Sequence, residues 1–237
     1  MIRIPALTSE EIILGKSSET AYPPIDKEII EQLLGGAADG ALPQESALRL
    51  LDAIGISREK TLVTCTIMEA KLAAIDIGYP INMQGISVHG GEEKELVENI
   101  TDENTMRLEF KRLMLSSEAR SVLISPALSG ARAYFGIRRR ARLGHLVICG
   151  TYASSQSKPE AFTACTLPVT KAEAREMFAR VKGSFQLSEI IFTDTLRRLS
   201  ALCEAAPQIE SMDIMPVVAS ARNVVALDAA VNVKTSN

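Results

Sequence analysis

The stretch that decides the fold is Ala131-Arg-Ala-Tyr-Phe-Gly-Ile137, which is followed after a short connection by His145-Leu-Val-Ile-Cys149. Both segments have the alternating pattern of strands, in which every second side chain points to the same face of a sheet. The connection between them, residues 138–144, contains Gly144. Two strands joined by a glycine-containing connection predict a β-hairpin.

Helical and strand patterns alternate irregularly on both sides of this hairpin. Thr170 and Glu173 form a capping box, in which each side chain can satisfy a backbone N–H of the first helical turn. Helices are predicted over 26–34, from about 43 to 54, around Met68, Leu72 and Ile75, after the N-cap Thr101, after Thr170, and over 192–203. Further strands are predicted over 61–66, 81–88, 96–100, 122–124, 212–218 and 223–228.

These elements predict an α+β or mixed α/β protein with two lobes, and we take the α+β class. Residues 1–25 form an N-terminal arm in this interpretation. The first lobe, with its leading helices, covers residues 26–120, and the second lobe covers residues 121–237.

The composition excludes several classes of protein. The 237 residues are 46% apolar and 23% charged, which rules out a disordered or collagen-like chain. A formal charge of −3 provides no basic field for nucleic acid or anionic lipid, and 4% aromatic residues provide no stacking platform. No apolar run approaches the ~20 residues that cross a bilayer, and the N-terminus lacks the pattern of a signal peptide.

The cysteines and the histidines limit the chemistry further. The cysteines are far apart and form no C-x-x-C motif, so we expect reduced thiols in a cytoplasmic protein. They are Cys65, Cys149, Cys165 and Cys203. With two histidines, His89 and His145, there is little material for a metal site built on imidazole.

Three short motifs allow both a functional and a purely structural interpretation. Gly15-Lys16-Ser17 resembles the end of a P-loop, but position 10, where a P-loop needs glycine, is Glu10. The arginine-rich run 138–142 could bind phosphate, although a solvated hairpin turn is the more common meaning of such a run. Asp213 and Asp228, on neighbouring late strands, could hold Mg²⁺ or could be ordinary strand-end residues.

Several segments, in the same order along the chain, resemble the ATP-grasp domain of NDP-forming acyl-CoA synthetases. This is the β-subunit type, related to succinyl-CoA synthetase β chains. The matching segments are residues 51–56, 74–80, 100–114, 166–178, 207–216 and 225–229, and the resemblance covers roughly residues 26–233. It implies a two-lobed ATP-grasp fold that clamps a nucleotide between its lobes.

The resemblance also implies a function and its cofactors. In this family a phosphoryl group passes through a histidine between ATP or ADP and an acyl phosphate, and CoA is the final acyl acceptor. A lysine holds the phosphates, while carboxylates and an asparagine hold Mg²⁺, because phosphoryl transfer depends on positioning and on neutralised charge. The implied partners are a CoA-binding α subunit or fused CoA-binding domain and a small-molecule acyl substrate, with no nucleic acid and no membrane.

The chain departs from the family pattern at nucleotide-facing positions. The phosphate-holding lysine falls on Gln84, which is neutral, and a glutamate falls on Arg132, which reverses the charge. The asparagine of the metal site falls on Met215, whose soft side chain is unsuited to Mg²⁺. The glycine loop falls on residues 150–153, and two further polar positions fall on Ser157 and Cys165.

Four residues remain as candidates for the site. His89, near the family's histidine, is the candidate catalytic residue, or a loop histidine without a role. Arg132 is a candidate for binding nucleotide or another anion. Asp228 and Asp213 are candidate metal ligands, or carboxylates kept without their metal.

Three hypotheses follow. The chain is a working, divergent ATP-grasp domain or subunit of an NDP-forming acyl-CoA synthetase, which uses Mg and ATP or ADP. Alternatively it is a non-catalytic ATP-grasp domain that serves as a structural or regulatory partner in an acyl-CoA synthetase-like assembly. In the third, Arg132 and the arginines of 138–142 bind an anionic small molecule such as a CoA phosphate.

Overall fold

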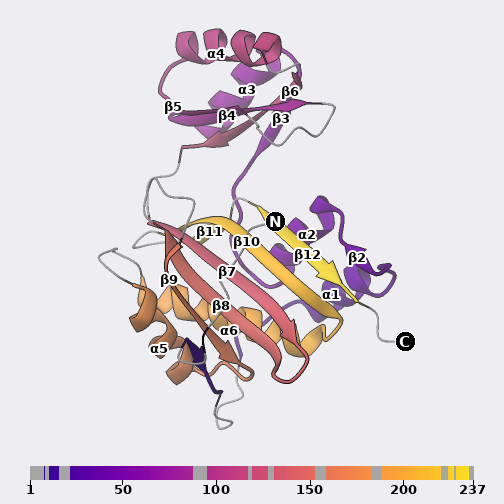
Figure 1. The fold of residues 1–237 in the computed structure, drawn as a ribbon. Helices are drawn as coiled ribbons and strands as arrows, with labels where there is room; N and C mark the ends of the chain where they lie inside the picture. The colour runs from indigo at the N-terminus through magenta and orange to yellow at the C-terminus, as the bar shows by residue number, and fades with distance from the viewer. Residues whose placement is uncertain are drawn as a thin grey trace. The chain divides into compact units, whose positions relative to one another are not determined.

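The computed structural model describes residues 8, 11–15, 22–87, 95–116, 119–127, 131–152, 159–182, 188–219, 224–226 and 228–234. The chain forms two compact units, which Figure 1 draws as ribbons. The smaller unit is residues 59–129, and the larger unit is residues 1–58 together with residues 130–237. The predicted α+β class with two sheets is confirmed.

The smaller unit is an antiparallel sheet with two helices on one face. Its strand order is β3 (Leu62–Thr64), β6 (Ala119–Pro126), β4 (Ile81–Ser87) and β5 (Leu96–Ile100). The helices α3 (Ile67–Ile77) and α4 (Glu103–Ser116) contact each other and both contact β6. Their inward residues and the sheet form a core of Ala70, Ala73, Ala74, Ile81, Met83, Ile100, Met106, Phe110, Leu113, Val122 and Ile124.

Polar side chains begin both helices. Thr66 and Glu69 form a capping box at α3: the Glu69 amide donates to Thr66 Oγ1 at 3.2 Å and the Thr66 amide donates to Glu69 Oε2 at 3.3 Å. At α4, Asp102 Oδ1 accepts hydrogen bonds from two backbone N–H groups of the first turn, at 2.9 and 3.0 Å. The cap is therefore Asp102 and not Thr101, because the carboxylate one residue later reaches both amides.

The larger unit is built on a sheet whose strand order is β1, β9, β8, β7, β10, β12 and β2, with β11 paired to β10. The bounds are β1 Ile12–Ile13, β2 Gly40–Ala41, β7 Ala131–Arg140, β8 Gly144–Tyr152, β9 Pro159–Thr166, β10 Ile209–Ala219, β11 Val224–Ala226 and β12 Ala229–Val233. The pairs within this sheet are antiparallel except β1 with β9.

The predicted hairpin is confirmed and is longer than expected. Strands β7 and β8 pair without a register shift from Arg132 opposite Tyr152 to Arg140 opposite Gly144. Gly144 has a φ of +70°, a conformation that glycine adopts at low cost and that the tight turn needs. Arg138, which was expected in the turn, therefore lies within β7, because the alternation of the strand continues through it.

Helices cover one face of the larger sheet. In Figure 1, α5 (Lys171–Val181) and α6 (Glu189–Ala205) lie against β7, β8 and β9. Their core includes a chain of aromatic rings: the Phe135 and Phe192 ring centres are 4.7 Å apart, and those of Phe178 and Phe192 are 5.3 Å apart. A smaller cluster of buried residues lies on the opposite face, formed by Tyr134, Leu146, Ile148 and Ala164.

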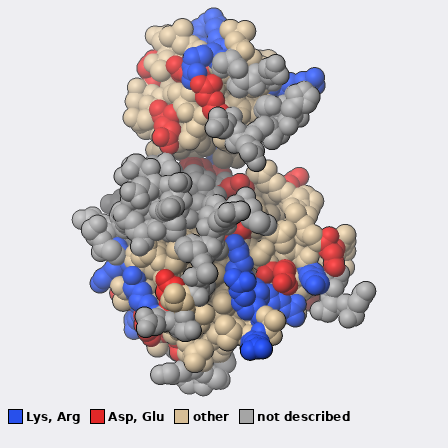
Figure 2. All heavy atoms as spheres, viewed as in Figure 1, with Lys and Arg blue, Asp and Glu red and all other residues tan. Residues whose placement is uncertain are grey.

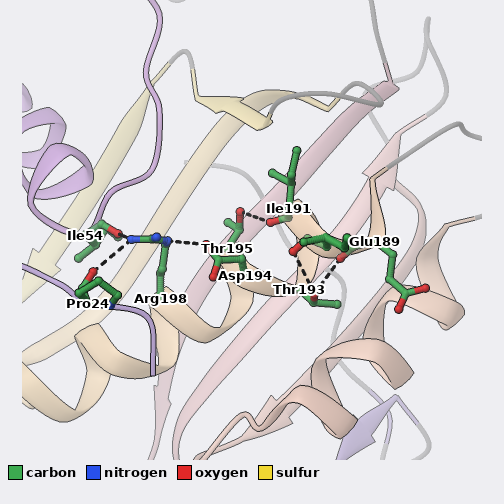
Figure 3. A network of polar contacts seen from close by, with 9 residues as sticks. Pro24, Ile54, Glu189, Ile191, Thr193, Asp194, Thr195 and Arg198 are labelled. Carbon is green, nitrogen blue, oxygen red and sulfur yellow. Dashed lines mark hydrogen bonds and ion pairs between the residues drawn. The ribbon is translucent and has the colours of Figure 1, made fainter. Parts of the chain in front are cut away.

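The leading helices α1 (Lys27–Leu34) and α2 (Gln44–Ala53) belong to the larger unit, whereas the sequence grouped them with residues 59–120. Helix α2 packs against β12, and β2 pairs with β12. Arg198 of α6 fixes the chain around these helices: its Nη1 donates to the carbonyl oxygens of Ile54 at 2.8 Å and Pro24 at 3.2 Å (Figure 3). Within the described residues, none of the helices is long and apolar enough to span a bilayer.

Candidate functional site

Gln84, which the resemblance places at a phosphate-holding lysine, lies in the middle of β4. It pairs with Leu123 of β6 on one side and with Leu96 of β5 on the other, and Leu123 in turn pairs with Val63 of β3. Directly paired residues project from the same face of a sheet, so these four side chains form one row, which we call the Gln84 row. Val63 is 60% exposed and Leu96 is 50% exposed, so the row is open to solvent at both ends.

The Gln84 row is uncharged. Its members are one neutral amide and three aliphatic side chains, and the neighbouring pairs on this face, Asn82 with Ser125 and Ile86 with Ser121, are uncharged too. Among these described, paired positions no cation is available to neutralise a polyphosphate. These paired positions are a neutral mixture of amide, hydroxyl and aliphatic side chains, without the cation that a phosphate cradle needs.

Asp213, a predicted metal ligand, is held by two side chains of its own sheet. Its Oδ1 accepts a hydrogen bond from the hydroxyl of Tyr134 at 2.8 Å and one from Arg138 Nη2 at 2.5 Å. The other guanidinium branch of Arg138 donates to the carbonyl oxygens of Met212 at 3.0 Å and Ile137 at 2.8 Å. The Arg138 and Asp213 side chains are 18% and 13% exposed, so this ion pair is largely removed from solvent screening.

Gly136 makes the contact between Tyr134 and Asp213 geometrically possible. It lies directly opposite Asp213 in the β7–β10 pairing, and a Cβ atom at this position would lie 2.1 Å from the Tyr134 hydroxyl. The missing side chain leaves the phenol free to cross the strand and reach the carboxylate. One cluster is therefore formed by Tyr134, Gly136, Arg138 and Asp213, which we call the Asp213 cluster.

Gly150, the first residue of the former glycine loop, accommodates an aromatic ring. A Cβ atom here would lie 2.5 Å from the ring of Phe162, its pairing partner on β9. That ring packs edge-on against Tyr134, with ring centres 5.6 Å apart. The Phe162 ring thus occupies the space over Gly150, which a glycine could otherwise leave open for the close approach of a phosphate.

Asp228, the second predicted metal ligand, is exposed and lies between β11 and β12. Its Oδ1 accepts hydrogen bonds from Gln44 Nε2 at 3.1 Å and from the Ala229 amide at 2.8 Å. Both donors are neutral, in contrast to the guanidinium on Asp213. In the part of the chain that the structure describes, no group of three or more His, Cys, Asp or Glu side chains is arranged to hold a metal ion.

The other two candidates remain predictions. His89 lies outside the described residues. Arg132 lies on β7 opposite Val218 and Tyr152, and its side chain is also outside the description. The second histidine, His145, donates from Nε2 to a backbone carbonyl oxygen at 2.7 Å.

A hollow that the sequence did not indicate lies beside the first turns of α5 and α6. Its volume is about 300 Å³, and it is lined by Lys171, Arg175, Glu189, Ile190, Ile191, Thr193, Asp194 and Arg197. Arg175 of α5 meets Glu189 of α6 across it at 3.2 Å, and Asp194 meets Arg198 one turn later on α6 at 2.7 Å. Figure 3 shows these α6 residues and the threonine hydroxyls that donate to carbonyl oxygens one turn earlier.

Buried ionisable groups elsewhere do not form a reactive site. Burial raises the pKa of the Cys165 thiol to about 12 and also raises the pKa of Cys149 and Cys203, so none of them is a thiolate nucleophile. Glu59, which opens the smaller unit, is only 8% exposed, and burial raises the pKa of its carboxyl group to about 7.

The comparison with protein families identifies the chain. A family described as ATP-grasp domain matches residues 35–233, and the chain belongs to this family. Acetate–CoA ligase (ADP-forming) II of Archaeoglobus fulgidus is 28% identical over 201 residues, which are 79% of this chain but 30% of that protein. The β subunit of acetate–CoA ligase (ADP-forming) II of Pyrococcus furiosus is 24% identical over 211 residues, which are 80% of this chain and 89% of that subunit.

The solved structures agree with the predicted ATP-grasp fold. Dinucleotide-forming acetyl-coenzyme A synthetase 1 of Ca. Korarchaeum cryptofilum, in complex with coenzyme A and Ca-AMPCP, has a TM-score of 0.69 at 17% identity, covering 88% of this chain and 100% of that one. Another structure of that protein holds coenzyme A and Mg-AMPPCP, with a TM-score of 0.66 at 18% identity, over the same shares of the two chains. At this identity the likeness establishes the fold, and this chain spans about 30% of the length of the relative from Archaeoglobus.

Proposed function

We propose that this chain is the ATP-grasp component of an acyl-CoA synthetase-like assembly and that it serves there as a structural or regulatory partner. In this proposal it does not itself transfer the phosphoryl group. The single observation that carries it is the Gln84 row, in which the phosphate-holding position is a neutral amide between two leucines. A polyphosphate placed there would lose hydration without gaining a cation, which is unfavourable.

The contacts of Asp213 do not favour a magnesium–nucleotide complex at this residue. A carboxylate binds Mg²⁺ through oxygen lone pairs, and Asp213 already directs Oδ1 to a guanidinium and a phenol. Releasing it would leave Arg138 largely buried without its counter-charge, at a cost of about 3 kcal/mol or more. Phe162 over Gly150 likewise favours a sheet face closed by protein side chains.

The proposed partner is a CoA-binding α subunit or a fused CoA-binding domain. Support comes from the relatives: one is named a β subunit of an ADP-forming acetate–CoA ligase, and another is an ADP-forming acetate–CoA ligase of which this chain matches only 30%. A small-molecule acyl substrate and a cytoplasmic location belong to the same proposal.

Isothermal titration of the full chain with Mg-ATP and Mg-ADP, alone and with a CoA-binding synthetase subunit added, tests the proposal. We expect no binding heat and no rise in melting temperature in either case. Ligand at about 100 times its dissociation constant would stabilise the fold by ~2.7 kcal/mol, which a thermal shift detects easily. The matched variants are Gln84→Lys, which adds a cation to the row, and Gln84→Met, which does not.

A working synthetase is the second candidate, and Asp228 is the observation that favours it. This carboxylate is exposed and meets only neutral donors, so a cation would not compete with an ion pair there. Saturable Mg-ATP binding by the unaltered chain that disappears in Asp228→Ala would establish this candidate and overturn the first. Binding that persists in Asp228→Ala would also overturn the first, and would place the nucleotide elsewhere.

A further inference from the structure

The outer edge of β9 is covered by a segment of the N-terminal arm. Strand β1 pairs with β9 in parallel, with Ile12 opposite Ala164 and Ile13 opposite Cys165. In Figure 1, β1 is the short indigo strand beside β9. The two ends of the strand order in the larger sheet, β1 and β2, are each strands of only two residues. Very short edge strands are one of the ways in which proteins prevent a sheet from pairing with another chain.

Hydrogen bonds attach the arm to β9 before and after β1. The carbonyl oxygen of Glu11 accepts a hydrogen bond from the Ala164 amide at 2.9 Å and another from the Thr163 hydroxyl at 3.0 Å. The Gly15 amide donates to Thr166 Oγ1 at 2.8 Å. The arm therefore occupies a backbone N–H of β9 that would otherwise be available to the strand of another chain.

The side chains of β1 pack on both faces of the sheet. Ile13 is 7% exposed and belongs to the main core of the larger unit, while Ile12 packs against the smaller cluster on the opposite face. Beyond them, the backbone of Gly15 lies very close to the chain that follows β9. A Cβ atom at Gly15 would lie 2.5 Å from the carbonyl oxygen of Thr166 and 2.7 Å from that of Pro168. The arm thus fits this edge through two buried side chains and through a glycine that allows close approach.

Most of β9 lacks the charged side chains that commonly protect an edge strand. Its first two residues are Pro159 and Glu160, but residues 161–166, Ala-Phe-Thr-Ala-Cys-Thr, are uncharged. Figure 2 shows acidic and basic side chains on the visible face of the larger unit, so charge is plentiful elsewhere on this unit. An uncharged segment with phenylalanine and threonine favours the strand form and is a template for pairing once its edge is open. Cover by the arm therefore protects the part of β9 that charge does not.

The arm has a second attachment, on α6. The hydroxyl of Tyr22 donates to Glu204 Oε1 at 2.7 Å and accepts a hydrogen bond from Ser200 Oγ at 3.0 Å. Residues 16–21, which connect the two attachments, lie outside the described residues. A covalent tether this short gives β1 an effective concentration on the order of millimolar at β9. A second copy of the chain does not reach this value in dilute solution, so the protein's own strand occupies the edge.

We propose that residues 11–15 act as a guard strand: β1 keeps the edge of β9 closed, and when β1 is displaced this edge pairs with the same edge of a second copy of the chain. Two β9 edges that pair antiparallel about a two-fold axis bring the same uncharged residues together on both copies. The proposal depends on the larger unit alone and is independent of the proposed function.

Two variants displace β1 in different ways. Gly15→Val places side-chain atoms against the backbone of residues 166–168, and Ile13→Asp places a charge in the core. Gly36→Val is the matched control, because a Cβ atom at Gly36 would meet nothing within 4 Å. Hydrogen exchange of the Ala164 amide, measured at low protein concentration, reports whether β1 is in place. We expect this exchange to be at least about tenfold faster in the first two variants and unchanged in the control.

Sedimentation velocity at rising protein concentration then measures association. We expect Gly15→Val and Ile13→Asp to associate reversibly, while the unaltered chain and Gly36→Val do not associate over the same range. A synthetic peptide with the sequence of residues 8–16, added in excess, should bind the open edge and suppress the association. Circular dichroism equal to that of the unaltered chain shows that a variant is still folded, and Gly15→Val keeps the core residues if Ile13→Asp unfolds.

Three results would overturn the proposal. The first is fast exchange of the Ala164 amide without association, since the edge would then be open and unused. The second is an amide that stays protected in both variants, which would show that the arm is not what closes this edge. The third is association that the peptide does not suppress or that Gly36→Val shares, because the chains would then meet through another surface.

Discussion

The carboxyl group of Glu59 should make this protein less stable as the pH rises. Burial raises its pKa from 4.5 to about 7, so between these values the folded protein holds a proton that the unfolded chain has released. The unfolding free energy then decreases with pH, because the native state binds more protons than the unfolded state. The stabilising contribution is complete below about pH 4.5 and is lost as the pH rises through about 7.

The size of the effect follows from the same two values. Each pKa unit is worth about 1.4 kcal/mol, so the rise of about 2.5 pKa units corresponds to at most about 3.5 kcal/mol between pH 4.5 and pH 8. Glu59→Gln keeps the shape and removes the titration, so its stability should not follow this decrease. An exposed acid in the first turn of α2, Glu45, provides the matched control as Glu45→Gln, which should keep the decrease intact.

Urea unfolding followed by circular dichroism, repeated at several pH values, measures the difference. The urea midpoints of the unaltered chain and of Glu59→Gln should be similar near pH 4.5. By pH 8 the variant should have the higher midpoint, and the m-values of the two proteins should remain equal. Parallel pH profiles for the two proteins would refute the reasoning, since the carboxyl group would then titrate alike in the folded and unfolded states.

Two further changes test packing that the structure specifies. Gly136→Ala puts a Cβ 2.1 Å from the Tyr134 hydroxyl and should lower the unfolding free energy by about 3 kcal/mol. The control Gly36→Ala, whose Cβ would meet nothing within 4 Å, should change the unfolding free energy by less than about 1 kcal/mol. Equal effects of the two variants in urea unfolding would contradict the Asp213 cluster. Arg198→Ala removes two hydrogen bonds to carbonyl oxygens and should lower the unfolding free energy by about 2 kcal/mol. The control Arg175→Ala, at an exposed ion pair, should lower it by no more than about 0.5 kcal/mol. Thermal unfolding of both variants measures the difference.

Local patterns predicted most elements of the fold. The hairpin, the capping box of Thr170 and Glu173, and the helices near 27–34, 44–53 and 189–205 depend on neighbours in sequence, and they are confirmed. Strand β9 was missed, because residues 159–166 contain a proline and little alternation, and their strand form depends on pairing with β8. Periodicity found α3 but does not tell which side of a helix is buried, and the larger side chains proved to be the exposed ones.

The candidate site was predictable only in part. The sequence shows that residue 84 is a neutral glutamine. Its leucine neighbours lie on strands β5 and β6, and only the register of these strands in the structure identifies them. Asp213 was proposed for a metal, and its contacts to Tyr134 and Arg138 could not be foreseen because they lie more than seventy residues away in the chain. The alternation Tyr134, Gly136, Arg138 was the one available signal, since it puts these residues on one face of a strand.

The interrupted larger unit has a consequence for the order in which this protein folds during synthesis. The smaller unit is one continuous segment, residues 59–129, so all of its contacts exist once that segment has emerged from the ribosome. Helices α1 and α2 are made earlier, yet α2 packs on β12 and β2 pairs with β12, which is made only after the smaller unit and strands β7 to β11. The first helices therefore lack this contact until β12 has been made, so an incomplete larger unit leaves apolar surface of α2 uncovered.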